Sequence, residues 1–178
     1  MNCGSVLYAE HDGTWVLRLT GDVRAPWCSP VDALLERVFA DPALRSVVVD
    51  LRDTTNIDST MLGLLARIGV LARNRLGSMP LLLAPRPDVR RLLDSMCLDK
   101  VLKIVDDDEI ARCACDGAVA REVPEVERSD AEVCDKVTGA HRALMELDER
   151  NRAAFHDVVT RLEDQQRGSS TGTPPTRH

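Results

Sequence analysis

Short aliphatic runs that alternate with helical segments constrain this chain more than any other feature of its sequence. Residues 46–51 (SVVVDL) and 81–83 (LLL) are continuous aliphatic runs, which is typical of strands buried on both faces. Around them, apolar residues recur at spacings of three and four, which predicts helices. Strands that alternate with helices imply right-handed crossovers and parallel strand pairs. The sequence therefore predicts an α/β domain of about 120 residues.

The expected elements follow one another closely. We expect strands at residues 14–20, 46–51, 81–83 and 101–105, and helices at residues 30–40, 60–76 and 87–96. Ser29 is expected to cap the first helix ahead of Pro30, and Gly21-Asp22 to end the first of these strands. Four acids at residues 106–109 predict the first turn of a further helix, because the helix dipole favours negative charge there.

The pattern changes at Pro124. We expect a domain at residues 1–122, a linker at 123–130, one long amphipathic helix at 131–166 and a disordered tail at 167–178. The tail is expected to be disordered because its Gly, Ser, Thr and Pro residues have almost nothing to bury. The predicted fold class is α/β, a sheet with parallel strand pairs and packed helices, with an added C-terminal amphipathic helix.

Composition argues against several classes of function. The 23 basic residues against 29 acidic ones give a net charge of −6, which disfavours nucleic-acid and membrane binding. Aromatic residues are only 3%, too few for a base-stacking surface. The first ten residues have no basic region followed by an apolar stretch, and six cysteines are scattered through the chain. We therefore expect no secretory signal, reduced thiols and a cytoplasmic location.

Enzyme signatures are missing from the sequence. It contains no phosphate-binding loop, no dinucleotide fingerprint and no G-x-S-x-G motif around Ser59. The four histidines lie away from the strand ends where an α/β site forms, and we expect His141 and His156 at the surface of the C-terminal helix. Cys113-x-Cys115 is too closely spaced for a zinc pair. We predict no catalytic activity, no cofactor and no metal.

The segment at residues 47–70 (VVVDLRDTTNIDSTMLGLLARIGV) is the most informative. A buried strand leads through a turn to Asp58, Ser59 and Thr60, at the start of a hydrophobic helix. This places a carboxylate and two hydroxyls where unpaired backbone N–H groups need acceptors. One interpretation is that Asp58 or Ser59 is simply a capping residue; the other is a functional site.

The pattern D-L-x-x-x-x-x-I-D-S-[ST]-x-L-G resembles the STAS domain of bacterial anti-sigma factor antagonists. Residues 19–23 (LTGDV), which include Asp22, resemble the family's L-x-G-[ED]-φ strand end, where φ is apolar. The order β, β, α, β, α, β, α, β, α over about two thirds of the chain also fits. The resemblance implies a STAS-like mixed sheet and ends before the C-terminal helix.

The resemblance implies a protein switch controlled by phosphorylation. In such antagonists a partner kinase phosphorylates the serine after the aspartate, here Ser59, and a PP2C-type phosphatase reverses the reaction. The unphosphorylated form binds an anti-sigma factor or a related regulator. A phosphate would add about −1.5 to −2 charges at a helix start, which the fold tolerates and a partner surface does not.

The predicted partner-binding surface surrounds Ser59. It comprises the residues Asp22, Arg24, Trp27, Asp58, Thr60, Met61, Leu64 and Arg67. Met61 and Arg24 depart from the family pattern, which often has Gly and an acid at those positions. Because Arg67 has to reach water, Leu64 beside it is expected to be partly exposed, unless Arg67 extends out of an otherwise buried helix. Trp27 is interpreted either as an anchor for a partner or as a local lid.

Two other classes of function remain open at this point. One is a non-switching STAS scaffold or transporter-accessory module, in which Ser59 is structural. The other is a nucleotide-binding or small-anion-binding module that uses the same helix N-terminus.

The predicted C-terminal helix has an apolar stripe at alternating spacings of four and three. Its candidate oligomerisation or docking residues are Val137, Leu144, Leu147, Asn151 and Val158. A single Asn at a heptad a position fixes register in parallel dimers, so one interpretation is a homodimer through this helix. The alternative is that the stripe docks on the chain's own domain.

Overall fold

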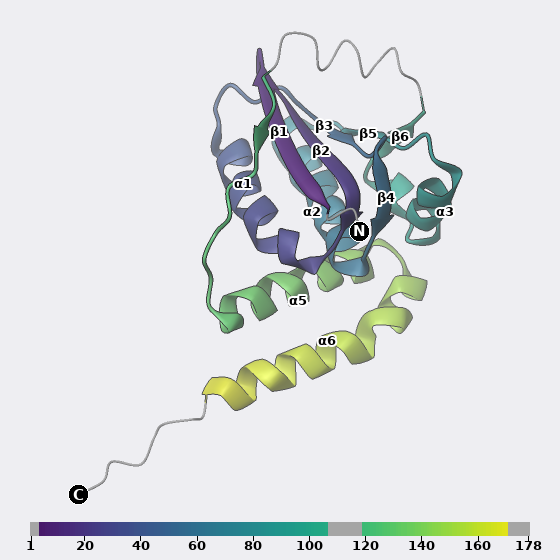
Figure 1. Cartoon of the computed structure of the whole chain (residues 1–178). Coiled ribbons are helices and arrows are strands. Elements are labelled where there is room, and N and C mark those ends of the chain that lie inside the picture. The colour runs from purple at the N-terminus through teal and green to yellow at the C-terminus, as the bar shows by residue number, and fades with distance from the viewer. Residues whose placement is uncertain (1–3, 107–118, 171–178) are drawn as a thin grey trace, which may run out of the picture.

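The computed structural model describes residues 4–106 and 119–170 and has a mixed β-sheet at its centre (Figure 1). In these residues the sheet has seven strands, in the order β6-β5-β3-β2-β1-β7, with β4 paired to β2 alone. Pairs β2/β3, β3/β5, β5/β6 and β2/β4 are parallel, and β1 pairs antiparallel with both β2 and β7. The strands are β1 (Ser5–His11), β2 (Thr14–Val23), β3 (Ser46–Asp50), β4 (Thr54–Ile57), β5 (Leu81–Leu83), β6 (Lys103–Val105) and β7 (Arg121–Glu122).

Helices α1 and α2 pack together, and the main core lies between them and the sheet. It includes Leu17 and Leu19 of β2, Val49 of β3 and Leu82 of β5, all at most 4% exposed. The helices are α1 (Cys28–Ala40), α2 (Ser59–Leu76), α3 (Pro87–Ser95), α5 (Asp130–Leu147) and α6 (Glu149–Ser170), with 3-10 turns η1 (Ala25–Trp27) and η2 (Leu98–Lys100). The predicted α/β fold class is confirmed.

Three local predictions were wrong. The strand expected to end before Gly21 continues to Val23, because Gly21 adopts a φ of 71° and the pairing register with β4 shifts beside it. The stretch 54–57, expected to be part of a turn, forms β4. Helix α1 begins at Cys28 rather than after a Ser29 cap, because η1 leads directly into it.

The C-terminal region is a helical hairpin and not the single helix expected at residues 131–166. The chain turns at Asp148, whose backbone is extended (φ −159°, ψ 149°), between α5 and α6. Helix α5 lies across α1 and α2, and α6 packs on α5 (Figure 1). Residues 167–170, expected to be disordered, continue α6. The helix expected from Asp106 and the tail at 171–178 lie outside the described residues.

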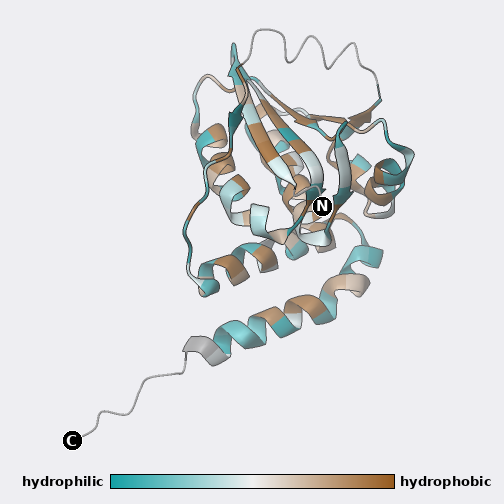
Figure 2. Cartoon of the chain, viewed as in Figure 1, coloured by the Kyte–Doolittle hydropathy of each residue, from teal (hydrophilic) through white to brown (hydrophobic). Residues whose placement is uncertain are grey.

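The segment expected to be a linker begins inside the fold. Glu122 belongs to β7, and the next residue, Val123, is 3% exposed and donates its backbone N–H to the carbonyl of Val6. The chain therefore leaves the sheet only after Val123. Figure 2 shows apolar residues along the central strands and mixed bands on α5 and α6. No helix in the described part of the chain is long and apolar enough to cross a membrane.

Candidate functional site

Asp58 fixes the start of α2. It is the N-cap residue: its Oδ1 accepts a hydrogen bond from the Met61 N–H at 3.0 Å. Its Oδ2 accepts from the Ala25 N–H at 2.7 Å, in the turn that follows β2. One carboxylate therefore joins the ends of β2 and β4 to the first turn of α2. An anion bound at this helix N-terminus would compete with that carboxylate, which argues against the small-anion interpretation.

Ser59 is the first residue of α2, and its hydroxyl contacts a histidine from the C-terminal hairpin. The distance from Ser59 Oγ to His141 Nε2 is 3.0 Å. His141 Nδ1 lies 2.9 Å from the carbonyl oxygen of Val137, to which it donates. In the neutral ring Nε2 is then the acceptor, so the Ser59 hydroxyl donates to His141. The two residues are 82 positions apart in the sequence.

His141 was expected at the surface, and that expectation was wrong. Its exposed fraction is 5%, because α5 packs on α2 and Phe155 of α6 covers the ring at a centroid distance of 5.3 Å. A Ser–His hydrogen bond is the geometry of a nucleophile and its base. Here, however, the buried imidazole lies against one side of the hydroxyl, and Ser59 itself stays partly exposed. We call this arrangement, in which α5 is docked beside Ser59, the closed chain.

A buried carboxylate lies beside this contact. Asp32 of α1 is 1% exposed, and it forms ion pairs with Arg67 of α2 and with Lys136 of α5, whose Nζ is 2.6 Å from Asp32 Oδ2. Lys136 also pairs with Glu36 at 3.3 Å. The hydrogen bond to Asp32 raises the pKa of Lys136. The cluster thus joins α1, α2 and α5.

Sequence reasoning missed Asp32, Lys136 and His141. The available signal was weak: Asp32 stands three residues before Leu35, on the apolar side of its helix, where an unpaired acid is costly. That position indicates a cationic partner, but nothing local identifies Lys136 as that partner.

The residues expected to form the partner-binding surface are divided between the surface and the interior. Asp22 and Arg24 pair with each other at 2.8 Å near the end of β2, where Arg24 is exposed. Trp27 is partly buried and packs against the main core. Thr60 is 5% exposed, and both Met61 and Leu64 are 0% exposed. The partial exposure expected for Leu64 was therefore wrong, because α2 is covered; Arg67 extends from a buried helix toward Asp32.

The C-terminal stripe docks in cis in this structure. Leu144 is fully buried, Val137 and Leu147 are partly buried, and Val158 is 40% exposed. Asn151 is 2% exposed, and its Nδ2 donates to the carbonyls of Met96, at 2.9 Å, and Leu144, at 3.0 Å. The expected pairing of Asn151 with a second Asn151 is therefore not what this structure contains, because the side chain is used within the chain.

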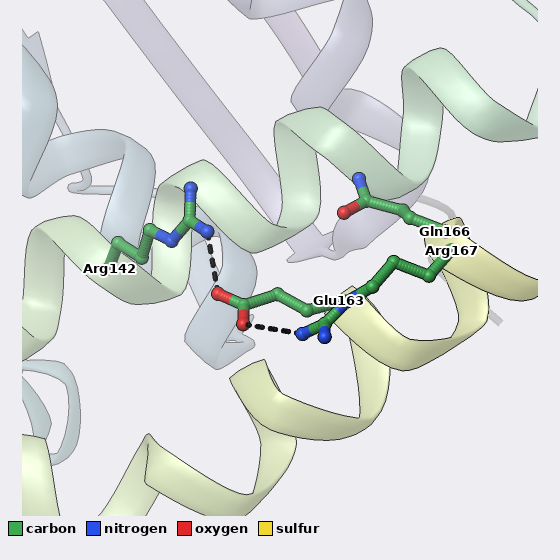
Figure 3. A pocket seen from close by; sticks show the side chains of 4 residues that line it. All are labelled: Arg142, Glu163, Gln166 and Arg167. Carbon is green, nitrogen blue, oxygen red and sulfur yellow. Dashed lines mark hydrogen bonds and ion pairs between the residues drawn. The ribbon is translucent and has the colours of Figure 1, made fainter.

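A polar pocket lies between the helices of the hairpin (Figure 3). It is lined by Arg142, Glu163, Gln166 and Arg167. Arg142 Nη2 of α5 is 2.5 Å from Glu163 Oε1 of α6, and Arg167 contacts the other oxygen at 3.8 Å. The Arg142–Glu163 pair joins α5 to α6, whereas the Arg167–Glu163 pair lies within α6.

Comparison with known proteins gives a family match and several structural neighbours. The family described as "Mlab, STAS domain" matches residues 6–106. The NMR structure of the protein TM1081 is 22% identical, covers 58% of this chain and 82% of that chain, and has a TM-score of 0.50. No curated protein matches the chain.

Two further solved structures are similar to this chain. An anti-sigma factor antagonist from Mycobacterium paratuberculosis is 22% identical over 64% of this chain and 96% of that chain, with a TM-score of 0.48. The anti-sigma factor antagonist SpoIIAA in its unphosphorylated form is 20% identical over 62% and 98%, with a TM-score of 0.47.

Proposed function

Because this chain belongs to the STAS domain family, we propose that it is a protein-binding switch controlled by phosphorylation, with Ser59 as the phosphoacceptor. In this proposal the unphosphorylated chain binds a regulatory protein, an anti-sigma factor or a serine kinase. A kinase inactivates it and a PP2C-type phosphatase restores it. The protein acts by binding and not by catalysis.

The observation that carries the proposal is the position of Ser59. Its hydroxyl belongs to the first residue of an 18-residue helix, directly after the N-cap Asp58. A phosphate on Ser59 would be held covalently near the positive end of the helix dipole while Asp58 keeps the N–H groups of Met61 and Ala25, so the fold stays intact. The same phosphate adds bulk and about −1.5 to −2 charges to any surface packed over Ser59. The change is therefore local, and its effect is on binding.

Phosphate mapping and bait capture test the proposal. Wild type and Ser59→Ala are incubated with ATP in cytoplasmic extract of the source cells, and phosphate is mapped by mass spectrometry. We expect phosphate on Ser59 and its loss in Ser59→Ala. Wild-type and Ser59→Asp baits are then compared for the proteins that they capture. The matched control, Ser78→Asp, adds the same charge at an exposed position.

The expected result is a protein captured by wild type and Ser78→Asp and reduced at least tenfold with Ser59→Asp. Phosphate on Thr54 or Thr55 and never on Ser59 would overturn the assignment. Equal capture by all three baits would instead support a second candidate function, a permanently docked STAS module. The observation that favours this second candidate is the hydrogen bond from Ser59 to His141, which gives the serine a structural role.

A further inference from the structure

The face of α1 and α2 that lies under α5 contains charged and closely packed positions that need contacts from a covering helix. We name it the capped face and define it by Asp32, Ser59, Gly63 and Arg67. Helix α5 covers it with Lys136, Ala140 and His141. Two properties of the capped face, its charge and the space above Gly63, determine which helix can pack on it.

Charge is the first requirement. Asp32 is 1% exposed and has two cationic partners, of which Arg67 belongs to the face and Lys136 to α5. Removing α5 takes away Lys136 and uncovers the carboxylate, whereas a helix that docks in place of α5 buries it again. A buried carboxylate is costly unless it is fully paired. The capped face therefore favours an overlying helix that supplies a cation beside Asp32.

Close approach is the second requirement. A Cβ placed on Gly63 would lie 2.1 Å from the carbonyl oxygen of Ala140. The backbones of α2 and α5 thus meet where neither helix carries a large side chain. Because Gly63 has no side chain, the two backbones can approach closely here. The face accepts only a helix with a small residue at this crossing.

The residues of α5 that meet these requirements are regularly spaced. Lys136, Ala140 and Leu144 stand four residues apart, on one side of a helix. Leu144 and Ala140 are both fully buried. The result is a simple pattern of a cation, a small residue and a leucine at positions i, i+4 and i+8.

We propose that the capped face is the helix-docking surface of this switch and that α5 fills it in cis. The partner displaces α5 by presenting a helix with a cation, a small residue and a leucine at the same spacing. This proposal rests on the proposed function for the identity of the partner as a regulatory protein. The docking surface and its occupant rest on the contacts above.

Occupation by α5 also excludes phosphate. Ser59 Oγ and His141 Nε2 are 3.0 Å apart, a hydrogen-bond distance with no room for a phosphoryl group between them. Ser59 is only partly exposed in the closed chain, and we infer that α5 moves away when a kinase binds the serine and stays away while the phosphate remains. The closed chain therefore has to open before either the partner or a kinase can bind at Ser59.

The first experiment measures access to residue 59 without any kinase. Full-length chains carry Ser59→Cys, and alkylation of residue 59 by iodoacetamide is followed by mass spectrometry. Gly63→Ala opens the chain from the face, and Ala140→Leu opens it from α5. The matched control is Gly139→Ala, because in the described part of the chain a Cβ there meets nothing within 4 Å. Circular dichroism confirms that each variant is folded.

We expect alkylation of residue 59 to be at least tenfold faster in both opened chains and unchanged in the control. Gly63→Ala lies on α2 and Ala140→Leu lies on α5, so either variant can still test the proposal if the other fails to fold. Equal rates in all folded chains would overturn cis occupation, whatever the kinase experiments give.

The second experiment probes the surface with a peptide of residues 129–147. Its binding to the full-length Ala140→Leu chain is measured by fluorescence anisotropy, against wild type as the closed reference. We expect at least tenfold tighter binding to the opened chain. Peptides with Lys136→Glu or Ala140→Leu are expected to lose at least tenfold in affinity.

The outcomes of these two experiments separate the two proposals. Equal binding of the three peptides would overturn the predicted spacing of cation and small residue. Fast alkylation and selective peptide binding, with no phosphate ever found on Ser59, would instead leave the docking surface standing and remove the phosphoswitch.

Discussion

At the scale of single residues, Asp58 accepts two hydrogen bonds, and only one of them could be predicted from the sequence. As an N-cap it was one of the open interpretations for the D-S-T segment, and the contact with the Met61 N–H agrees with it. The contact with the Ala25 N–H comes from a loop 33 residues away and has no local signal.

Replacing Asp58 by alanine is expected to lower the free energy of unfolding by about 1–3 kcal/mol. The change leaves the N–H groups of Met61 and Ala25 without their acceptors. Urea denaturation measures the loss. Asp88→Ala, in the exposed first turn of α3, is the control, expected to stay within about 0.5 kcal/mol of wild type. Equal effects of the two changes would contradict the bridging role of Asp58.

At the scale of elements, the sequence predicted strands better than it predicted their ends. The aliphatic runs at β3 and β5 are unmistakable because both faces of these strands are covered. Strand β4 (TTNI) has no such run, since within residues 4–106 and 119–170 it pairs only with the end of β2. Strand β4 forms because β2 continues past Gly21. That continuation depends on the backbone conformation of Gly21, which the apolar pattern of the sequence does not predict.

The division of the C-terminal region into α5 and α6 also had no local signal. The apolar spacing continues through residue 148, and neither Gly nor Pro marks the turn. Contacts with the rest of the fold decide it. Lys100 Nζ lies 2.8 Å from Asp148 Oδ2, and Asn151 donates to Met96 beyond α3.

The turn between α5 and α6 is expected to lose stability in acid. The hydrogen bond from Lys100, with further bonds from Arg150, holds the pKa of Asp148 well below its ordinary value. A carboxyl with a lowered pKa in the folded state stabilises that state above its ordinary pKa, and the contribution is lost as the pH falls. The difference in Tm between wild type and Asp148→Asn should therefore shrink below about pH 4.

Thermal unfolding between pH 7 and pH 3 measures this difference. Asp135→Asn, at an exposed position of α5, is the control and should stay close to wild type throughout. A difference for Asp148→Asn that grows as the pH falls would show that the carboxylate is not stabilised by its neighbours.

At the scale of the whole molecule, the capped face is the feature that sequence reasoning could not assemble. Ser59 was identified from its own segment, but His141 lies 82 residues away on a helix that was expected to be separate. Asp32 and Arg67 are likewise 35 residues apart. A sequence motif describes residues that are close in the chain. The capped face could not be found in this way, because it forms where the hairpin of α5 and α6 docks on α1 and α2.

Docking in cis predicts how the whole molecule responds to Asn151→Leu. The change leaves the carbonyls of Met96 and Leu144 without their donor, and it is expected to cost about 1–3 kcal/mol. Because the helix is satisfied within one chain, the Tm of wild type and variant should not change over a roughly hundredfold range of protein concentration.

Calorimetry and sedimentation make the measurement, with Arg152→Leu at an exposed neighbouring position as the control. A Tm that rises with concentration, or tighter self-association of Asn151→Leu, would favour the parallel dimer instead.

The long separation between Ser59 and His141 also has a consequence in time. A ribosome adds about 5–20 residues per second, so His141 is made about 4–16 s after Ser59. Domains fold from the N-terminus as they emerge, and the sheet with α1 and α2 precedes the hairpin. Every newly made molecule thus passes through an interval of seconds in which Ser59 has been synthesised and His141 of α5 has not.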